Sequence, residues 1–257
     1  MRYILILYVK IVKKTNWLCS GIAQRITRWT GKSSVNVHPK HLLESSPEWL
    51  EFFSKEDVIL DIGCNNGQRD FRLSSLVKQI VAFDYNDSVI NDAIKIQKER
   101  GLNNIRFQVM SAEDPWPFQN ESFDGILFLD VIEHLYKRDF VMRECFRVLK
   151  KGGKIVVAAP NTETPWKKFQ KSLGLNYYSD PDHKIEYSES EFRELFKNAG
   201  FTIESLDTVV YDFPLVGVID LIGAFSLKVY GYLQQWKVNV ARKHPHKSVG
   251  FLVLARK

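Results

Sequence analysis

The 257-residue sequence has few cysteines and no pattern that would use them. Cys19, Cys64 and Cys145 lie far apart and form no CxxC pair. Three thiols leave an odd one in any disulfide scheme, which argues against a disulfide-stapled fold. We therefore expect a reducing compartment, the cytoplasm.

Acidic residues are missing from both ends of the chain. Residues 1–43 contain eight Lys or Arg and residues 221–257 contain seven, and neither segment has an Asp or Glu. Residues 44–220 hold 21 basic against 30 acidic residues, so the net charge of +6 hides basic ends on an acidic body. Such ends favour contact with anions such as lipid headgroups or a phosphorylated substrate. Nucleic acid is disfavoured, because the basic residues form no aromatic-interleaved stripe along the body.

No apolar run is long enough to cross a bilayer. Met1–Val12 (MRYILILYVKIV) is interrupted by Arg2 and Lys10, and no small-residue cleavage site follows it. It is therefore interpreted neither as a transmembrane helix nor as a signal peptide. Two interpretations stay open: an interfacial helix, which Trp17 and Trp29 would support, or a helix packed on the core.

The middle of the chain alternates between short apolar runs and amphipathic stretches. A helical period with capping signals marks three stretches, Ser88–Gly101, Asp139–Gly152 and Ser188–Gly200. This alternation predicts a parallel sheet with helices on both faces. The expected strands are Asp57–Asp61, Gln79–Asp84, Ile105–Met110, Asp124–Asp130, Gly153–Ala159, Phe201–Val210 and Ser248–Ala255.

These elements suggest four regions. Residues 1–50 form a basic amphipathic helical segment, 51–212 a catalytic core, 213–247 an apolar and basic helical insertion or lid, and 248–257 the last core strand. Within the core, Asn161–Ile185 is expected to be a long loop or short-helix insertion over the strand ends, where substrate contacts are common.

The segment Val58–Gly67 (VILDIGCNNG) carries the main functional signal. A sharp turn after a parallel strand lets backbone N–H groups approach a ligand where side chains are small. The dinucleotide fingerprint GxGxxG would need glycine at positions 63, 65 and 68, and only Gly63 fits. NAD binding is therefore disfavoured.

This segment resembles the first motif of the class I S-adenosylmethionine-dependent methyltransferases, D-x-G-x-G-x-G. Asp61, Gly63 and Gly67 match, and Asn65 replaces the central glycine. Asn tolerates a positive φ, so the turn can form, although its side chain narrows the site. The resemblance implies that S-adenosylmethionine is the cofactor. It also implies that Asp61 faces the amino group of its methionine part and that the glycines let the backbone close in.

Further motifs resemble the branch that includes ubiquinone- and menaquinone-biosynthesis methyltransferases. They are LDVIEHL at 129–135 and RVLKKGG at 147–153, followed by IVVAAPN. The resemblance covers about residues 55–160, with a weaker continuation over His183–Phe201. It implies an α/β fold, a doubly wound Rossmann-like sheet of seven strands, mostly parallel with the last strand antiparallel, plus helical N-terminal and late-insertion segments.

Asp84 closes the second expected strand, 23 residues after Asp61. A carboxylate about 20 residues beyond the glycine loop can accept both hydrogen bonds of a ribose diol. Tyr85 is a neighbouring candidate for cofactor contact. The alternative for Asp84 is a helix cap before Ser88.

The third strand ends near Ala112 and Glu113, which are similar to the adenine-edge motif of the family. The resemblance implies that these residues contact the exocyclic amine of adenine, whereas a surface acid in a turn is the competing interpretation. Asp130, within LDVIEHL, completes the expected cofactor-binding set.

Two histidines are candidates for the catalytic base that a hydroxyl acceptor would need. His134 follows the fourth strand, where a neutral imidazole can take a proton near neutral pH. Glu133 and His134 can equally stabilise the turn. His183, with Asp182 and Glu186 nearby, is the second candidate, and its alternative is an exposed loop histidine.

The histidine and cysteine spacings fit no metal site. His38 and His41 lack partners, and His244 and His246 lie in the basic tail, so we expect no metal.

The apolar stretch Phe213–Val240 is unusual for this family. It is broken by Asp220 and Lys228, yet richer in apolar residues than a solvated helix requires. It favours either docking at an anionic membrane surface, peripheral at the inner membrane face, or a lid or homodimer helix. The sequence thus predicts a methyltransferase for a small, hydrophobic or lipid-linked acceptor, methylated at oxygen or carbon. The alternative is a catalytically silent, cofactor-binding partner subunit.

Overall fold

The computed structural model describes residues 1–33, 36–43 and 48–257, and the chain forms two compact units. Unit 1 comprises 1–46, 161–179 and 208–250; unit 2 comprises 47–160, 180–207 and 251–257. All the expected cofactor-binding and catalytic residues belong to unit 2. Residues 161–179, grouped with the core on sequence grounds, fall in unit 1.

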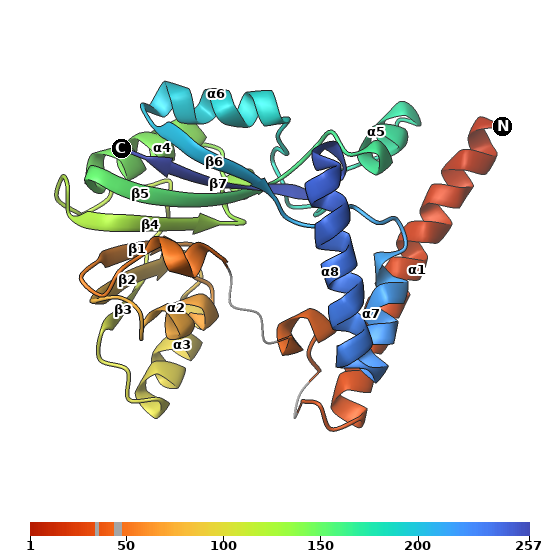
Figure 1. Ribbon diagram of the computed structural model, residues 1–257, viewed down its shortest axis with the longest axis horizontal. Coiled ribbons are helices and arrows are strands. Elements are labelled where there is room, and N and C mark those ends of the chain that lie inside the picture. Colours follow the sequence, from red (N-terminus) through yellow and green to blue (C-terminus); the bar gives the residue numbers. More distant parts are fainter. Residues whose placement is uncertain (34–35, 44–47) are drawn as a thin grey trace. The chain divides into compact units, whose positions relative to one another are not determined.

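The sheet has seven strands in the order β3-β2-β1-β4-β5-β7-β6 (Figure 1). β1 pairs in parallel with β2 and β4, β2 with β3, and β4 with β5. β7 runs antiparallel to β5, because Gly152 bonds to Lys257 whereas Asn161 bonds to Val249. The predicted doubly wound, mostly parallel sheet is confirmed. The strands are β1 Val58–Ile62, β2 Gln79–Asp84, β3 Ile105–Val109, β4 Phe123–Leu129, β5 Leu149–Pro160, β6 Thr202–Thr208 and β7 Gly250–Arg256.

Alternating strand residues build two apolar layers, one on each face of this sheet. Leu60 and Ile126 point to the face covered by α4 (Arg138–Val148) and α6 (Glu189–Ala199). Their neighbours Ile59 and Leu127 point to the other face. There, α2 (Gln68–Leu73) and α3 (Asp87–Glu99) pack against the sheet (Figure 1). Short 3-10 turns η2 (Glu48–Phe52) and η3 (Ile132–His134) complete unit 2.

One helix boundary differs from the sequence prediction. The helix expected over Asp139–Gly152 ends at Val148, and Leu149 already pairs with Phe123 of β4. The basic run Lys150–Lys151 therefore belongs to the start of β5, because strand pairing outweighs the helical preference of these residues.

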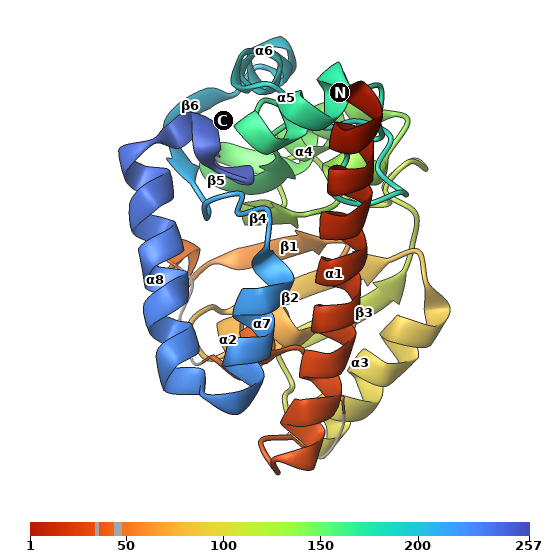
Figure 2. The same cartoon turned by 90° about the vertical axis from the view of Figure 1, so that its right-hand side faces the viewer.

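Three helices dominate unit 1, with α7 (Val216–Phe225) between α1 (Arg2–Trp29) and α8 (Leu227–Lys243) (Figure 2). Asn16 of α1 joins that helix to α7. Its side-chain amide donates to the carbonyl of Pro214 and accepts from the N–H of Gly217. A Cβ on Gly217 would lie 2.7 Å from the Asn16 backbone, so glycine permits this close crossing. Unit 1 also holds α5 (Pro165–Ser172), η1 (Pro39–Leu42) and η4 (Pro245–Lys247).

Asp220, which interrupts the apolar stretch, is a buried structural residue of unit 1. Its carboxylate accepts from the Tyr230 hydroxyl at 3.1 Å and meets His38 Nε2 at 3.1 Å. Burial lowers the pKa of Lys237, while Asp220 opposes that shift. None of the helices within the described ranges combines the length and hydropathy needed to cross a membrane.

Candidate functional site

The candidate site lies where the strand order reverses, at the carboxyl ends of β1 and β4. Open parallel sheets bind ligands at such a switch point. The loop after β1 turns back sharply, since the N–H groups of Gly63 and Cys64 both donate to the carbonyl of Phe83. Gly63 has a φ of 71°, and a Cβ there would lie 2.4 Å from a Val131 methyl group. The loop therefore sits against the segment after β4 only because residue 63 is glycine.

Gly67 plays a similar part at the start of α2. Its φ is 75°, and a Cβ would lie 2.6 Å from the Phe107 ring. Asn65 adopts a φ of 51° between the two glycines, and its Oδ1 accepts from the N–H of Asn66 at 2.7 Å. Asn at the central position thus preserves the positive-φ turn.

Asp61 is fully buried at the end of β1 beside a second buried acid, Asp70 of α2. Among the described residues, neither carboxyl meets a hydrogen-bond donor, and the two interact with each other. Burial raises the pKa of Asp61 to about 6, although Arg69 opposes the rise. Burial also raises the pKa of Asp70, and the neighbouring Asp61 adds to this effect. A cationic group placed here would relieve an acidic pair that the protein itself leaves unsatisfied.

Arg69 joins α2 to the end of β4. Its guanidinium donates to the carbonyl of Leu129 at 3.2 Å and to Asp130 Oδ2 at 2.9 Å. Asp130 itself takes a φ of 60° and stays largely exposed at the rim. The structure thus places Asp130 at the mouth of the site, paired with Arg69.

Asp84 lies at the end of β2 and organises two loops. Its Oδ2 accepts from the N–H of Asn65 and its Oδ1 from the N–H of Asn86, each at 3.0 Å. Asn86, and not Asp84, caps α3, with its side chain accepting from Ser88. Each carboxylate oxygen retains acceptor capacity, so a ribose diol can still bind. Tyr85 is exposed beside it.

The adenine-edge candidates lie in the turn after β3. Ala112 is buried, and its carbonyl accepts from the Trp116 indole at 3.0 Å. One carboxylate oxygen of Glu113 already has partners within the protein, because Oε1 accepts from the backbone N–H groups of Tyr136 and Lys137. Glu113 therefore links the β3 turn to the segment after η3.

The two candidate catalytic histidines come together although 49 positions separate them. The carbonyl of Glu133 accepts from the N–H of Lys184 at 2.7 Å, which holds the 180–187 loop beside η3. The rings of His134 and His183 meet edge to face with centroids 4.8 Å apart. His183 Nδ1 lies 2.9 Å from Glu186 Oε1, so His183 is a partly buried, anchored histidine and not an exposed loop residue.

Comparison with known proteins gives this geometry a family. Residues 53–200 match the family model described as a methyltransferase domain. A probable S-adenosylmethionine-dependent methyltransferase of Mycolicibacterium smegmatis is 30% identical over 57% of this chain and 52% of its own length. A ubiquinone biosynthesis O-methyltransferase of Xanthomonas axonopodis is 26% identical over 68% of this chain and 76% of its own.

Solved structures agree on the fold. The YcgJ protein of Bacillus subtilis superposes with a TM-score of 0.56 at 22% identity, over 81% of this chain and 95% of that one. An S-adenosylmethionine-dependent methyltransferase of Methanosarcina mazei superposes with a TM-score of 0.58 at 19% identity, over 84% of this chain and 99% of that one. The chain belongs to the methyltransferase-domain family. Its reaction class is methyl transfer, and its cofactor is S-adenosylmethionine.

The residues present in this methyltransferase fit that cofactor. The buried carboxylate of Asp61 lacks a donor that the methionine ammonium group would supply. Gly63, Asn65 and Gly67, each at positive φ, hold the loop backbone in its turn. The contacts expected with ribose and adenine remain predictions. The positions of the residues proposed for them agree with those roles: Asp84, Tyr85, Ala112, Glu113 and Asp130.

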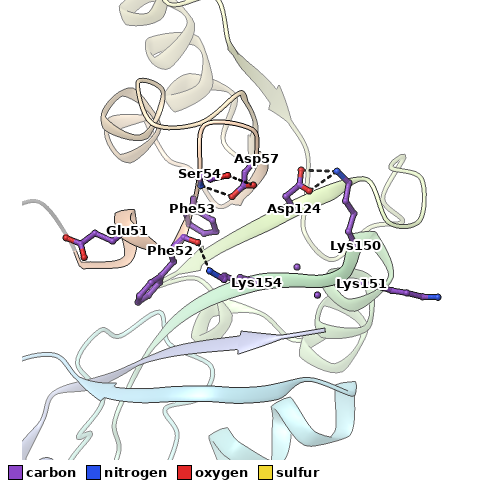
Figure 3. Close-up of a pocket in the computed structure, with 11 residues that line it drawn as sticks. Glu51, Phe52, Phe53, Ser54, Asp57, Asp124, Lys150, Lys151 and Lys154 are labelled. Atoms are coloured by element: carbon purple, nitrogen blue, oxygen red, sulfur yellow. Dashed lines mark hydrogen bonds and ion pairs between the residues drawn. The ribbon is translucent and has the colours of Figure 1, made fainter.

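A cavity of about 420 Å³ lies at the opposite, amino-terminal ends of β1 and β4 (Figure 3). Two of its lysines already have partners: Lys150 pairs with Asp124, and Lys154 donates to the carbonyl of Phe52. Lys151 points away from the cavity. This cavity of the methyltransferase is therefore separate from the cofactor loops.

Sequence reasoning missed two residues of the candidate site, Arg69 and Asp70. It also missed the contact by which Glu186 positions His183. Arg69 and Asp70 lie in a six-residue helix with no strong periodic signal, and an acid in a first turn usually faces solvent. Only the packing of α2 against the sheet reveals that Asp70 is buried beside Asp61.

Proposed function

We propose that this methyltransferase transfers the methyl group of S-adenosylmethionine to a hydroxyl oxygen, or an activated carbon, of a small hydrophobic or lipid-linked acceptor. The observation that carries the proposal is the His134–His183 pair at the carboxyl end of β4. Val131, three residues before His134, packs directly on Gly63 of the cofactor loop. The pair therefore lies next to the place where the cofactor is expected.

Bound S-adenosylmethionine supplies an electrophilic methyl carbon on a positively charged sulfur. Asp61 is proposed to accept the methionine ammonium group and Asp84 the ribose hydroxyls, while Ala112, Glu113, Tyr85 and Asp130 border the adenosine. Orientation and exclusion of water contribute much of the rate in such displacements. His134 and His183 are proposed to promote loss of the acceptor proton, and Glu186 to hold His183 in one orientation.

An exposed surface of α1 supports the hydrophobic nature of the acceptor. Val9, Val12 and Ala23 face inward, whereas the outer side of the helix exposes aliphatic and aromatic residues. The helix as a whole carries six basic residues and no acids. We define this outer face as the α1 stripe. Its apolar members are Ile4, Leu7, Ile11, Trp17, Leu18, Ile22 and Trp29.

The charge of unit 1 supports a membrane location. Its residues include 16 Lys or Arg against four Asp or Glu. A basic helix with exposed Trp and aliphatic residues is typical of peripheral binding to anionic membrane surfaces. We propose that the protein works at such a surface, where a lipid-linked acceptor would be concentrated.

The test is transfer of a radiolabelled methyl group from S-adenosylmethionine into a membrane lipid extract. We expect a labelled, organic-soluble product. His183→Asn and His134→Asn should lower kcat by about 10²-fold or more while leaving cofactor affinity within about twofold. The exposed His246→Asn is the matched control. Cofactor binding without labelled product in any fraction would favour the catalytically silent, cofactor-binding subunit.

A further inference from the structure

The His134–His183 pair is part of a larger cluster of metal-ligating atoms. Within the part of the chain that the structure describes, side chains of Glu133, His134 and His183 offer one ligand atom each, and these atoms all lie within 4.8 Å of one another. His183 Nε2 and Glu133 Oε1 are 3.9 Å apart. The expectation of no metal rested on spacing along the chain, which could not show this approach.

We propose that Glu133, His134 and His183 bind one divalent transition-metal cation, of the class that includes Zn²⁺, Mn²⁺ and Co²⁺. Imidazole nitrogen with a single carboxylate suits these ions, whereas Mg²⁺ and Ca²⁺ prefer oxygen ligands alone. Three protein ligands leave further coordination positions open, as in catalytic sites.

The separations fit a site that closes on the ion. Bonds of about 2.0–2.2 Å place the ligands of one ion roughly 3–3.5 Å apart, so these side chains would move inward by about 1 Å or less. Such a shift is small, because η3 and the 180–187 loop are already joined by the Glu133–Lys184 backbone bond. The backbone therefore brings the ligands together and leaves side-chain torsions to finish the geometry.

Glu186 supplies the second feature of a metal site. Its fully buried carboxylate lies 2.9 Å from Nδ1 of His183, which turns Nε2 toward Glu133 and His134. Metal-binding histidines commonly donate their other N–H to a carboxylate in this way. Glu133 and Glu186 are both buried, so their two negative charges would balance one dication in a region of low dielectric.

The inference rests on the proposed function and deepens it. A cation beside the cofactor site would draw electrons from the acceptor oxygen and favour loss of its proton to solvent water. The oxygen lone pair then forms the new O–CH₃ bond, and the electron pair of the broken C–S bond stays on sulfur. Atoms and charges balance with no oxidant or reductant.

The direct test is titration of the full-length, chelator-treated protein with Co²⁺. We expect one equivalent to bind with micromolar or tighter affinity and to produce a d–d absorption band. Hyperfine-shifted imidazole N–H resonances from two histidines should appear in the proton NMR spectrum. Because this measurement needs no variant, it stands even if a substitution unfolds the chain. Absence of binding at millimolar Co²⁺, Zn²⁺ and Mn²⁺ would overturn the proposal.

Variants then locate the site. Glu186→Gln should weaken binding by about 10–100-fold, and His134→Asn and His183→Asn by more. The matched control is His244→Asn combined with His246→Asn. This change removes two exposed histidines of unit 1 whose rings lie beside each other. Binding that survives His134→Asn and His183→Asn, or that disappears in this control, would contradict the assignment.

Failure of this inference can be separated from failure of the proposed function. Methyl transfer that continues undiminished in excess chelator, together with absence of cation binding, would leave the methyltransferase proposal intact. His183 would then be explained as an imidazole held between two carboxylates. Cation binding without any methyl transfer would support the metal site and contradict the proposed methyltransferase function.

Discussion

The backbone N–H of Asn65 donates to Asp84 Oδ2 over 3.0 Å, so the end of β2 holds the loop that follows β1. The same carboxylate accepts from the N–H of Asn86, which precedes α3. Asp84 therefore has a structural part in the cofactor loop in addition to its proposed part in ribose binding. Asn65 accommodates this arrangement with a positive φ, as few residues other than glycine do.

We expect Asp84→Ala to weaken S-adenosylmethionine binding by at least tenfold. The change removes the carboxylate that accepts from two backbone N–H groups and is the proposed ribose acceptor, and a hydrogen bond to a charged group contributes about 1.5–3 kcal/mol. Isothermal titration calorimetry measures the loss. Asp92→Ala, at an exposed acid of α3, is the control and should bind as the native chain does. Native-like affinity in Asp84→Ala would contradict the cofactor assignment.

Cofactor affinity should rise with pH through about pH 6 and level off above about pH 7. The pKa of Asp61 is raised to about 6 by burial, and only its ionised form attracts an ammonium group. Asp70 titrates with Asp61 as a coupled pair, so the midpoint belongs to both carboxyls. Calorimetry between pH 5 and 8, roughly the range over which the pair ionises, gives the profile. A flat profile in the native chain would argue against Asp61 as the ammonium partner.

The raised pKa of Asp61 should also affect the stability of the protein in the absence of cofactor. A carboxyl whose folded pKa exceeds its unfolded value favours folding when protonated. That contribution is complete below about pH 4 and is lost as pH rises to about 6. Asp61→Asn should therefore raise the free energy of unfolding at pH 7 by about 1–3 kcal/mol and have less effect at pH 4. It should also reduce the pH dependence of cofactor binding to the part that Asp70 contributes.

Gly63→Ala should destabilise unit 2 and prevent cofactor binding. The new methyl group would meet Val131 Cγ2 at 2.4 Å, and the φ of 71° adds backbone strain of about 1 kcal/mol. Adding Val131→Ala should restore part of the thermal stability, because it removes the clash but not the strain. Gly101→Ala, also at positive φ but in open space, separates the two costs. Equal melting temperatures for the Gly63→Ala and Gly101→Ala variants would contradict this account.

The strand positions and the cofactor loop could be predicted from sequence because their signals are local. The apolar residues Val58–Leu60, the glycines at 63 and 67 and the carboxylate of Asp84 lie within a few residues of the structure they determine. The end of α4 could not be predicted, because Lys150 and Lys151 continue a helical pattern until Leu149 pairs with Phe123. Tertiary pairing overrides local preference there.

Residues that act across long sequence separations were beyond local reasoning. The expectation of no metal considered histidine spacings along the chain, whereas His134 and His183 meet only because Lys184 bonds to the carbonyl of Glu133. Likewise, Asp220 was interpreted as an interruption of an apolar stretch. Its role depends on Tyr230 and His38, which approach it only in the folded unit 1.

The α1 stripe should bind anionic vesicles. We expect the full-length protein to sediment with vesicles of phosphatidylglycerol and phosphatidylcholine, and less with phosphatidylcholine alone. Added salt should weaken binding, because each basic residue near the surface contributes about 1 kcal/mol. Replacing Leu7, Ile11 and Leu18 by Gln should lower the partition coefficient at least tenfold, since inserting each aliphatic side chain contributes roughly 1 kcal/mol or more.

The control for the vesicle measurement is Val109→Gln, which removes an apolar residue that is equally exposed in β3 of unit 2. This variant should partition as the native chain does, because it lies outside the stripe and has no basic helix around it. A second copy of the chain is the competing occupant of the stripe. If light scattering shows a dimer that the triple variant separates, and vesicle binding is the same for both, the stripe is a subunit interface. The membrane proposal then fails, while the methyltransferase site is unaffected.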